Sequence, residues 1–220
     1  MRVVIAGGHG KIALALEKML ADRGDSVAGL IRNADQSEDL RSAGAEAIVV
    51  DLENSSVDEL AALLQNADAV VFAAGAGPGS GIERKTTVDR DAAILLADAA
   101  EAAGVGRYLM VSAMGADSQP ADNTGDPVFA AYLTAKAAAD EAVRGRPALN
   151  ATIVRPGALT DDAGTGRVRV AASTGRGSIP RADVAAMLVA LLDAPSTSGV
   201  TFELISGDAS IEEAMSVLSG

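Results

Sequence analysis

The sequence predicts an α/β protein in which a parallel β-sheet carries helices on both faces. Residues 3–6 form a short apolar run, typical of a buried strand, that ends in a glycine-rich turn. An amphipathic helical pattern begins at Ile12, directly after this turn. Apolar strands and helical segments then alternate along most of the chain, which is the order that gives a parallel sheet with right-handed crossovers.

The glycine-rich turn fits the fingerprint of a dinucleotide-binding, Rossmann-type doubly wound fold. Its spacing is Gly8-x-Gly10-x-x-Ala13 or Gly7-x-x-Gly10-x-x-Ala13. Such glycines let the chain turn sharply and approach a pyrophosphate, and the small third residue lets the helix pack on the sheet. Free N–H groups at the helix start favour bound phosphate. The cofactor contacts predicted here are Gly7, Gly8, His9, Gly10, Lys11 and Ile12. The alternative is a glycine turn with a structural role only.

Composition excludes several classes of function. The 220 residues include no cysteine, which excludes disulfides, thiolate metal sites and cysteine nucleophiles. The single histidine, His9, is expected to offer its backbone to the phosphate loop, so neither a metal site nor a catalytic triad is predicted. The net charge of −12 argues against partners such as nucleic acid or anionic membranes. With no membrane-length apolar run and no signal peptide, a cytoplasmic protein is expected.

The remaining elements of the first part follow from apolar patterns and end signals. Strands are expected at 26–31, 45–50, 67–73, 107–111 and 151–154. Helices are expected at 57–64, 87–103 and 128–144, with a short helical pattern between the second and third strands. Ser55 or Ser56 can cap the helix at 57–64, and Gly104 ends the helix at 87–103.

The C-terminal part, residues 157–220, is expected to add a small substrate-side region to a single domain, residues 1–220. It contains a possible strand at 164–172, an apolar helix opening at 180–184 and ending near Asp193, and a strand at 200–205. Ser210 and Glu213 have the spacing of a capping box for a short last helix. Any substrate pocket would be small and formed by the loops after Ala113 and Pro156 together with residues 160–167.

Several candidate cofactor residues follow strands, because ligands of open α/β sheets bind at the carboxyl ends of the strands. Arg32 stands where an NAD-binding site would carry an acid, so NADP(H) is predicted to be preferred over NAD(H). Asp51 could accept a hydrogen bond from the adenine amino group, with Leu52 against the ring, or it could form an Asx turn. Small residues after the fourth strand would let the backbone pass close to the adenosine ribose; they are Ala73, Ala74 and Gly75.

Tyr132 and Lys136 carry the predicted chemistry. Residues four apart share one face of a helix, and an ammonium group beside a phenol lowers the pKa of the phenol. A phenol tuned in this way can exchange a proton with a carbonyl while hydride moves, and Lys136 can also hold the ribose of the nicotinamide. The alternative is an ordinary surface tyrosine and lysine, because this spacing often occurs by chance.

The whole chain resembles the atypical short-chain dehydrogenase/reductase group of compact NAD(P)H-binding proteins. It is similar to the NmrA-like proteins and to biliverdin-IXβ/flavin reductase. The motifs that carry the resemblance are at residues 7–13, 31–32, 51–52, 73–75, 111–115, 132–136, 154–157 and 181–184. The resemblance implies a bound NAD(P)H and, through the motif at 154–157, a cofactor contact at Pro156.

The same resemblance raises a question about a third catalytic residue. Enzymes of the superfamily place a serine at the end of the fifth strand, to hydrogen-bond the substrate carbonyl. Here the matching residue is Ala113, and Ser112 lies one place earlier. Adjacent strand residues face opposite ways, so Ser112 can join the catalytic residues only if the strand end twists. Otherwise Tyr132 and Lys136 would serve cofactor binding more than proton transfer.

Three functions remain open at this point. The first is an NADP-dependent oxidoreductase that reduces a small carbonyl, quinone or flavin-like acceptor. The second is a non-catalytic NAD(P)-binding redox sensor, and the third is a sugar-nucleotide-type epimerase or dehydratase, which the short C-terminal region disfavours. Arg155 could bind an anionic group of the substrate or pair with an acid of the fold. A monomer or a homodimer is expected.

Overall fold

The computed structural model describes residues 1–77, 79–117 and 126–220. Within them, one large sheet has the strand order β11-β8-β10-β6-β5-β4-β1-β2-β3. Its strands are β1 (Arg2–Ala6), β2 (Ser26–Ile31), β3 (Glu46–Val49), β4 (Ala69–Phe72), β5 (Arg107–Val111), β6 (Asn150–Pro156), β8 (Arg167–Ala171), β10 (Thr201–Ser206) and β11 (Ala209–Ser210). The order β3-β2-β1-β4-β5-β6 confirms the predicted doubly wound, Rossmann-type fold.

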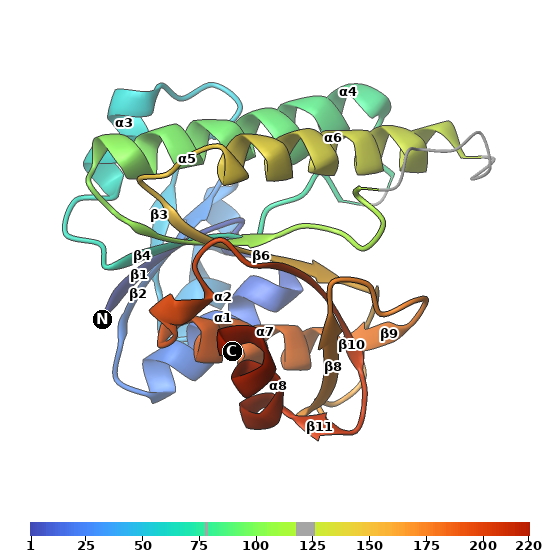
Figure 1. Ribbon diagram of the computed structural model, residues 1–220. Coiled ribbons are helices and arrows are strands. Elements are labelled where there is room, and N and C mark those ends of the chain that lie inside the picture. The colour runs from blue at the N-terminus through green and yellow to red at the C-terminus, as the bar shows by residue number, and fades with distance from the viewer. Residues whose placement is uncertain (78, 118–125) are drawn as a thin grey trace.

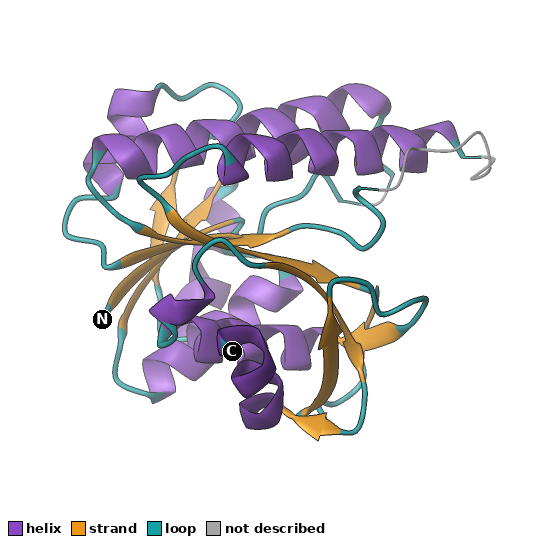
Figure 2. Ribbon diagram, in the orientation of Figure 1, coloured by secondary structure: helices purple, strands orange, loops and turns teal. Residues whose placement is uncertain are grey.

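Helices cover both faces of this sheet (Figure 1, Figure 2). One face carries α3 (Val57–Leu63), α5 (Ala92–Ala102) and α6 (Pro127–Arg144), and the other carries α1 (Lys11–Asp22) and α7 (Arg181–Leu192). The shorter helical elements are η1 (Ala34–Gln36), α2 (Ser37–Ser42), α4 (Ile82–Arg84), η2 (Lys85–Asp91), η3 (Pro195–Thr197) and α8 (Ile211–Ser219). None of the helices in the described ranges is long and apolar enough to cross a membrane.

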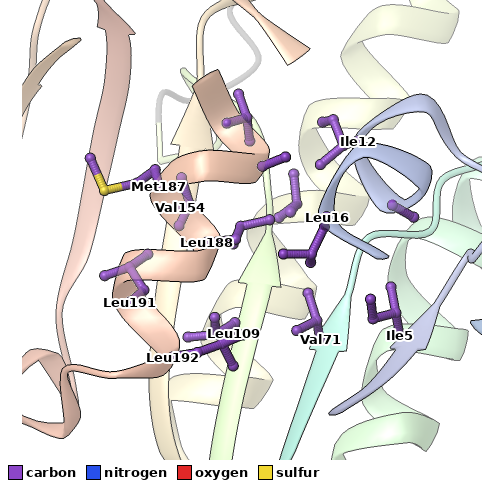
Figure 3. Packing of buried hydrophobic residues seen from close by; sticks show 14 of the residues in the cluster. Ile5, Ile12, Leu16, Val71, Leu109, Val154, Met187, Leu188, Leu191 and Leu192 are labelled. Carbon is purple, nitrogen blue, oxygen red and sulfur yellow. The ribbon is translucent and has the colours of Figure 1, made fainter. Parts of the chain in front are cut away.

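The core consists of two apolar layers, one on each face of the sheet. Ile5 and Leu109 point toward α1 and α7, where they join Leu16 and Leu188 (Figure 3). The intervening residues of the same strands point to the opposite layer, which packs under α3, α5 and α6. This arrangement follows from the alternation of side chains along a strand.

Local end signals set the helices that the sequence predicts most clearly. Ser56, rather than Ser55, caps α3, and Ser210 caps α8; each forms the predicted capping box with the glutamate three residues later. At the start of α6, the Asp126 carboxylate accepts hydrogen bonds from the N–H groups of Val128 and Phe129.

One predicted helix differs in its form. The expected helix at 87–103 begins earlier, at Ile82, and passes through a π-helical turn, η2, before continuing as α5. Val88 is the only apolar residue of η2, so the periodicity of this segment could not indicate its wider turn. This turn is important for the site, because it places two charged side chains against α6.

The C-terminal part extends the sheet. β10 joins β6 in parallel, whereas β8 runs antiparallel to β10 and β11 runs antiparallel to β8. Two further strands, β7 (Ala158–Thr160) and β9 (Ser178–Pro180), pair with each other outside the main sheet. The sequence analysis missed β7, β9 and β11, since runs of two or three residues have no detectable apolar period.

Candidate nucleotide-binding and catalytic site

The turn between β1 and α1 approaches neighbouring strands so closely that a side chain would not fit. Gly7 has a φ of +80°, and an added Cβ would lie 2.6 Å from the Cα of Ala74, which follows β4. At Gly8 an added Cβ would lie 2.8 Å from the Cα of Gly29 in β2. Gly10 stands at the N-cap of α1, where it makes no side-chain cap. The open helix start fits a phosphate group of a dinucleotide.

A cavity of about 280 Å³ lies beside this turn, at the carboxyl ends of β1, β2 and β3. Seven of the predicted cofactor residues line it, namely Gly7, His9, Gly10, Arg32, Asp51, Leu52 and Ala74. Gln36, Glu53 and Arg84 also line it, although the sequence analysis did not single them out. The adenosine half of a dinucleotide is the part that such a cavity accommodates in this fold.

Two lining residues also have partners within the protein. His9 Nε2 lies 2.7 Å from Asp39 Oδ2 in α2, so the imidazole ring has a partner within the protein. Asp51 Oδ1 accepts a hydrogen bond from the Glu53 N–H at 3.0 Å, which is the predicted alternative of an Asx turn. A second bond, from the Asn54 amide, is the main cause that lowers the pKa of Asp51.

Other predicted cofactor residues are not in the lining of the cavity. Ile12 is buried in the core layer of α1, and the Ala73 N–H donates to the Ala6 carbonyl. At Gly75 an added Cβ would lie 3.1 Å from Oδ1 of Asp89. Pro156 is buried at the end of β6, where its carbonyl accepts a hydrogen bond from the Met114 N–H.

Lys11 links the glycine turn to the C-terminal region. Its ammonium group pairs with the Asp161 carboxylate, which also accepts a bond of 2.6 Å from Arg181 at the start of α7. The side chains of Lys11 and Asp161 are largely exposed, and that of Arg181 is partly buried. Lys11 therefore connects the two halves of the chain across the edge of the sheet, close to the candidate phosphate site.

Glu17 lies beneath the glycine turn, on the buried face of α1. Its carboxyl group is fully buried, and neither oxygen has a hydrogen-bond partner among the described residues. An added Cβ at Gly8 or at Gly29 would meet this group at 3.0 Å or 2.4 Å. Burial raises the pKa of Glu17 from its ordinary value of 4.5 to about 8.

This burial predicts a stability that falls as the pH rises. The pKa of the folded state is the higher one, so the contribution of Glu17 is fully present below pH 4.5 and is lost as the pH rises through about 8. One pKa unit is worth about 1.4 kcal/mol. Glu17→Gln should therefore have a higher melting temperature than the wild type at pH 8.5 and a similar one at pH 5.

Thermal unfolding at several pH values tests this prediction. The matched control is Glu212→Gln, which removes an exposed carboxylate from α8. Its stability should differ little from that of the wild type at either pH. A wild-type protein and a Glu17→Gln variant that lose stability in parallel between pH 5 and pH 8.5 would contradict the assignment.

Tyr132 and Lys136 share one face of α6, as predicted, and they meet two charged residues of η2. The Lys136 ammonium lies 3.3 Å from Asp89 Oδ1 and also donates to the carbonyls of Ala74 and Val111. Lys85 and Lys136 lie 5.4 Å and 5.9 Å from the centre of the Tyr132 ring. The cluster thus joins the ends of β4 and β5 to α6.

The electrostatics of this cluster differ from the expectation. Burial is the main cause that raises the pKa of the Tyr132 phenol, and the carboxylates of Asp89 and Asp140 raise it further. The expected lowering of this pKa by Lys136 is wrong; the ammonium group of Lys136 pairs with Asp89. Burial also lowers the pKa of Lys136, against the opposing effect of Asp89. At neutral pH the phenol is protonated, which suits a proton donor.

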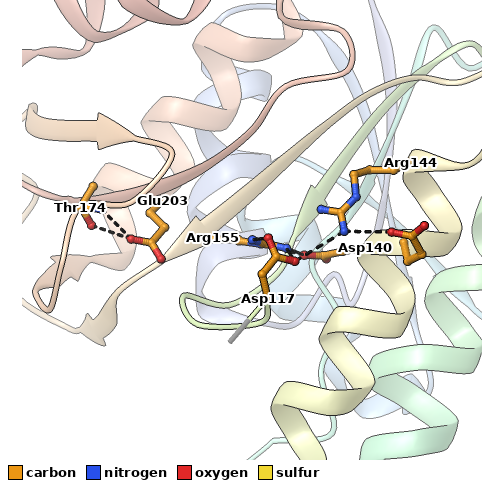
Figure 4. A network of polar contacts seen from close by, with 7 residues as sticks. Asp117, Asp140, Arg144, Arg155, Thr174 and Glu203 are labelled. Atoms are coloured by element: carbon orange, nitrogen blue, oxygen red, sulfur yellow. Dashed lines mark hydrogen bonds and ion pairs between the residues drawn. The ribbon is translucent and has the colours of Figure 1, made fainter. Parts of the chain in front are cut away.

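Arg155 belongs to a polar network on the same side of the sheet (Figure 4). Arg155 donates to Asp140 Oδ2 at 2.8 Å and to Asp117 Oδ1 at 2.7 Å, which confirms the alternative that it pairs with acids of the fold. Ser112 is buried near Asp140, whose pKa is raised by burial and lowered in part by this serine. Ser112 therefore faces the network, and Ala113 occupies the next position.

Two residues of η2 are further functional candidates that the sequence analysis missed. Lys85 and Asp89 are 8% and 0% exposed, an unusual burial for charged side chains. Lys85 lies two positions before the predicted helix at 87–103 and Asp89 lies within it, so spacing on one predicted helix could not have paired them. In the described part of the chain no group of acidic or histidine side chains could hold a metal ion.

Comparison with known proteins identifies the family. A Bacillus subtilis (strain 168) protein described as an uncharacterized sugar epimerase is 37% identical over 219 residues, 99% of this chain and 100% of its own. A structure from Bacillus halodurans is 37% identical, with a TM-score of 0.88, and covers 99% of this chain and 98% of its own. It is described as an NAD-dependent epimerase/dehydratase. The structure of an oxidoreductase from Lactococcus lactis is 27% identical with a TM-score of 0.86, covering 99% and 96%. The model of a family described as NAD(P)H-binding matches residues 7–195, and the chain belongs to this family.

Proposed function

We propose that the protein is an NADP-dependent oxidoreductase that reduces a small carbonyl, quinone or flavin-like acceptor. The observation that carries this proposal is the buried cluster around Tyr132, at the carboxyl ends of β4 and β5 and next to the glycine turn. NADPH, when bound, supplies a hydride. Tyr132 then donates its proton to the substrate oxygen, and its raised pKa keeps this proton in place until that step.

The residues around the phenol would assist this proton transfer. Lys85 and Lys136 place their ammonium groups 5.4 Å and 5.9 Å from the centre of the ring that gives up the proton. Asp89 holds Lys136 in position and balances part of this charge. Ser112 is a weaker candidate, because its side chain is buried near Asp140.

The substrate would bind beside Tyr132, in a region that the residues from 157 onward help to form. Phe129 is 46% exposed, and its ring lies 6.0 Å from that of Tyr132. This aromatic surface suits a planar apolar acceptor. Part of the predicted wall, residues 118–125 of the loop after Ala113, lies outside the described residues.

The proposed preference for NADP(H) depends on Arg32, at the mouth of the cavity. Arg32→Ala is expected to weaken NADPH binding about tenfold or more and to leave NADH binding nearly unchanged, because only NADPH carries the 2′-phosphate. Fluorescence titrations with both cofactors measure the two dissociation constants. Arg41→Ala, which removes an exposed arginine of α2, is the control. Equal losses for both cofactors would contradict the assignment.

The experiment that tests the function is a titration with NADPH and NADH, followed by consumption assays with quinones, flavins and small aldehydes. Tight NADPH binding with turnover on one of these panels would support the reductase. Binding without turnover would favour the redox sensor. The absence of a serine at position 113 and the three protein partners of Lys136 are the observations that favour this second candidate.

An epimerase or dehydratase is the third candidate, and the names of the Bacillus relatives favour it. Such an enzyme would use Tyr132 with a cofactor that is regenerated within each turnover. Conversion of a sugar nucleotide with only catalytic amounts of oxidised cofactor would establish it. In the described ranges, β8, β10 and β11 belong to the main sheet, which leaves little chain for a substrate lobe.

A further inference from the structure

Glu53 lies between two arginines inside the candidate adenosine cavity. Its Oε2 atom accepts hydrogen bonds from Arg32 Nη1 at 3.0 Å and from Arg84 Nη2 at 2.8 Å. Its other oxygen, Oε1, accepts a bond of 2.6 Å from the Thr87 hydroxyl. The hydrogen bond from Thr87 is the main cause that lowers the pKa of Glu53, and the two arginines lower it further. The carboxylate is therefore charged.

This contact brings together three segments that are distant in the sequence. Arg32 follows β2, Glu53 follows β3, and Arg84 ends α4. Arg32, Glu53 and Arg84 all line the cavity, and the side chain of Glu53 is 21% exposed. Two guanidinium groups that meet at one oxygen atom form a binding place for an anion, and a phosphate oxygen has the same requirements as a carboxylate oxygen.

We propose that Glu53 determines cofactor specificity, because it occupies an anion subsite that Arg32 and Arg84 would otherwise offer to the 2′-phosphate of NADP(H). This inference rests on the proposed use of the cavity for the adenosine half. A 2′-phosphate displaces the carboxylate from the two arginines, whereas a free 2′-hydroxyl leaves it in place and donates a hydrogen bond to it. Glu53 therefore weakens NADPH binding and supports NADH binding.

Arg84 has an equal part in this subsite. The sequence analysis assigned the 2′-phosphate to Arg32 and not to Arg84, but the guanidinium group of Arg84 lies at the same oxygen of Glu53. When the carboxylate is removed, Arg32 and Arg84 lose the acid that is hydrogen-bonded to both, and the net charge of the subsite becomes more positive by one. A dianion such as a phosphate monoester gains more from this change than a neutral hydroxyl group does.

The test uses Glu53→Gln, with Glu83→Gln as the matched control. Both variants remove one carboxylate, but Glu83 is exposed on α4 and does not line the cavity. Dissociation constants are measured by calorimetry for NADPH and NADH, and also for adenosine 2′,5′-bisphosphate and ADP. The last two probes report on the adenosine end without any reaction.

We expect Glu53→Gln to raise the preference for the 2′-phosphorylated compound about tenfold, which corresponds to one charge-assisted hydrogen bond. Glu83→Gln should keep the wild-type preference. A preference in Glu53→Gln that equals that of the wild type, or that moves toward NADH, would overturn the proposal. Thr87→Val removes the bond to Oε1 and should give a smaller change in the same direction, so it serves as a second test if Glu53→Gln unfolds.

The outcomes separate this inference from the proposed function. If the wild type binds neither adenosine 2′,5′-bisphosphate nor ADP, the cavity does not hold an adenosine, and both proposals are wrong. If the wild type binds both compounds and Arg32→Ala weakens only the binding of adenosine 2′,5′-bisphosphate, the cofactor assignment holds. An unchanged preference in Glu53→Gln and Thr87→Val would then refute the role of Glu53 alone.

Discussion

Replacing Gly7 by alanine is expected to abolish dinucleotide binding and to lower the melting temperature. The new Cβ would lie 2.6 Å from the Cα of Ala74 and 2.8 Å from its backbone nitrogen. These are backbone atoms next to paired strands, since β1 and β4 are hydrogen-bonded neighbours. The glycine turn would have to move away from β4, and the first N–H groups of α1 would move with it.

Gly24→Ala is the matched control for this prediction. Gly24 has a φ of +92°, similar to the +80° of Gly7, but an added Cβ there would meet nothing within 4 Å. Its cost is the left-handed backbone alone, about 1–2 kcal/mol. Thermal unfolding and NADPH titration of both variants separate backbone strain from the close approach. Equal losses of stability, with NADPH binding intact in Gly7→Ala, would contradict the role of the turn.

Tyr132→Phe should lower kcat by about 100-fold or more and change NADPH affinity little, because only the proton donor is removed. The raised pKa of the phenol also predicts a rate that stays level across neutral pH and does not fall with loss of this proton. Steady-state kinetics on an acceptor found in the panels measure both effects.

The second tyrosine of the chain provides the control. Tyr108 is fully buried in β5, and its hydroxyl donates to the Ala93 carbonyl at 3.3 Å. Tyr108→Phe should lower the melting temperature slightly and leave kcat unchanged. Full activity in Tyr132→Phe would remove the proton-donor role and leave the cofactor-binding role of the cluster.

Some features of this site could be predicted from the sequence because they depend on residues that are adjacent in the chain. The turn at Gly7 follows directly from an apolar strand and leads into a helix, and this order is itself the fingerprint. Ser56 caps α3 through reciprocal hydrogen bonds with Glu59, which is three residues later in the chain. Arg32 could be placed at a strand end, and Tyr132 and Lys136 on one helix face, from spacing alone.

Other features arise only in the folded chain. Glu53 meets Arg32 across 21 positions of sequence, and Lys11 meets Asp161 across 150. The folded chain buries the Tyr132 phenol and brings Asp89 of the π-helical turn near it, and both effects raise its pKa where a lowering was expected. By itself, the sequence determined the main strands and helices, the glycine turn for the phosphate, and the places of the candidate residues on these elements. The tertiary structure decided which charges neutralise one another, because a charge interacts with whatever lies within a few ångströms, however distant that partner is along the chain.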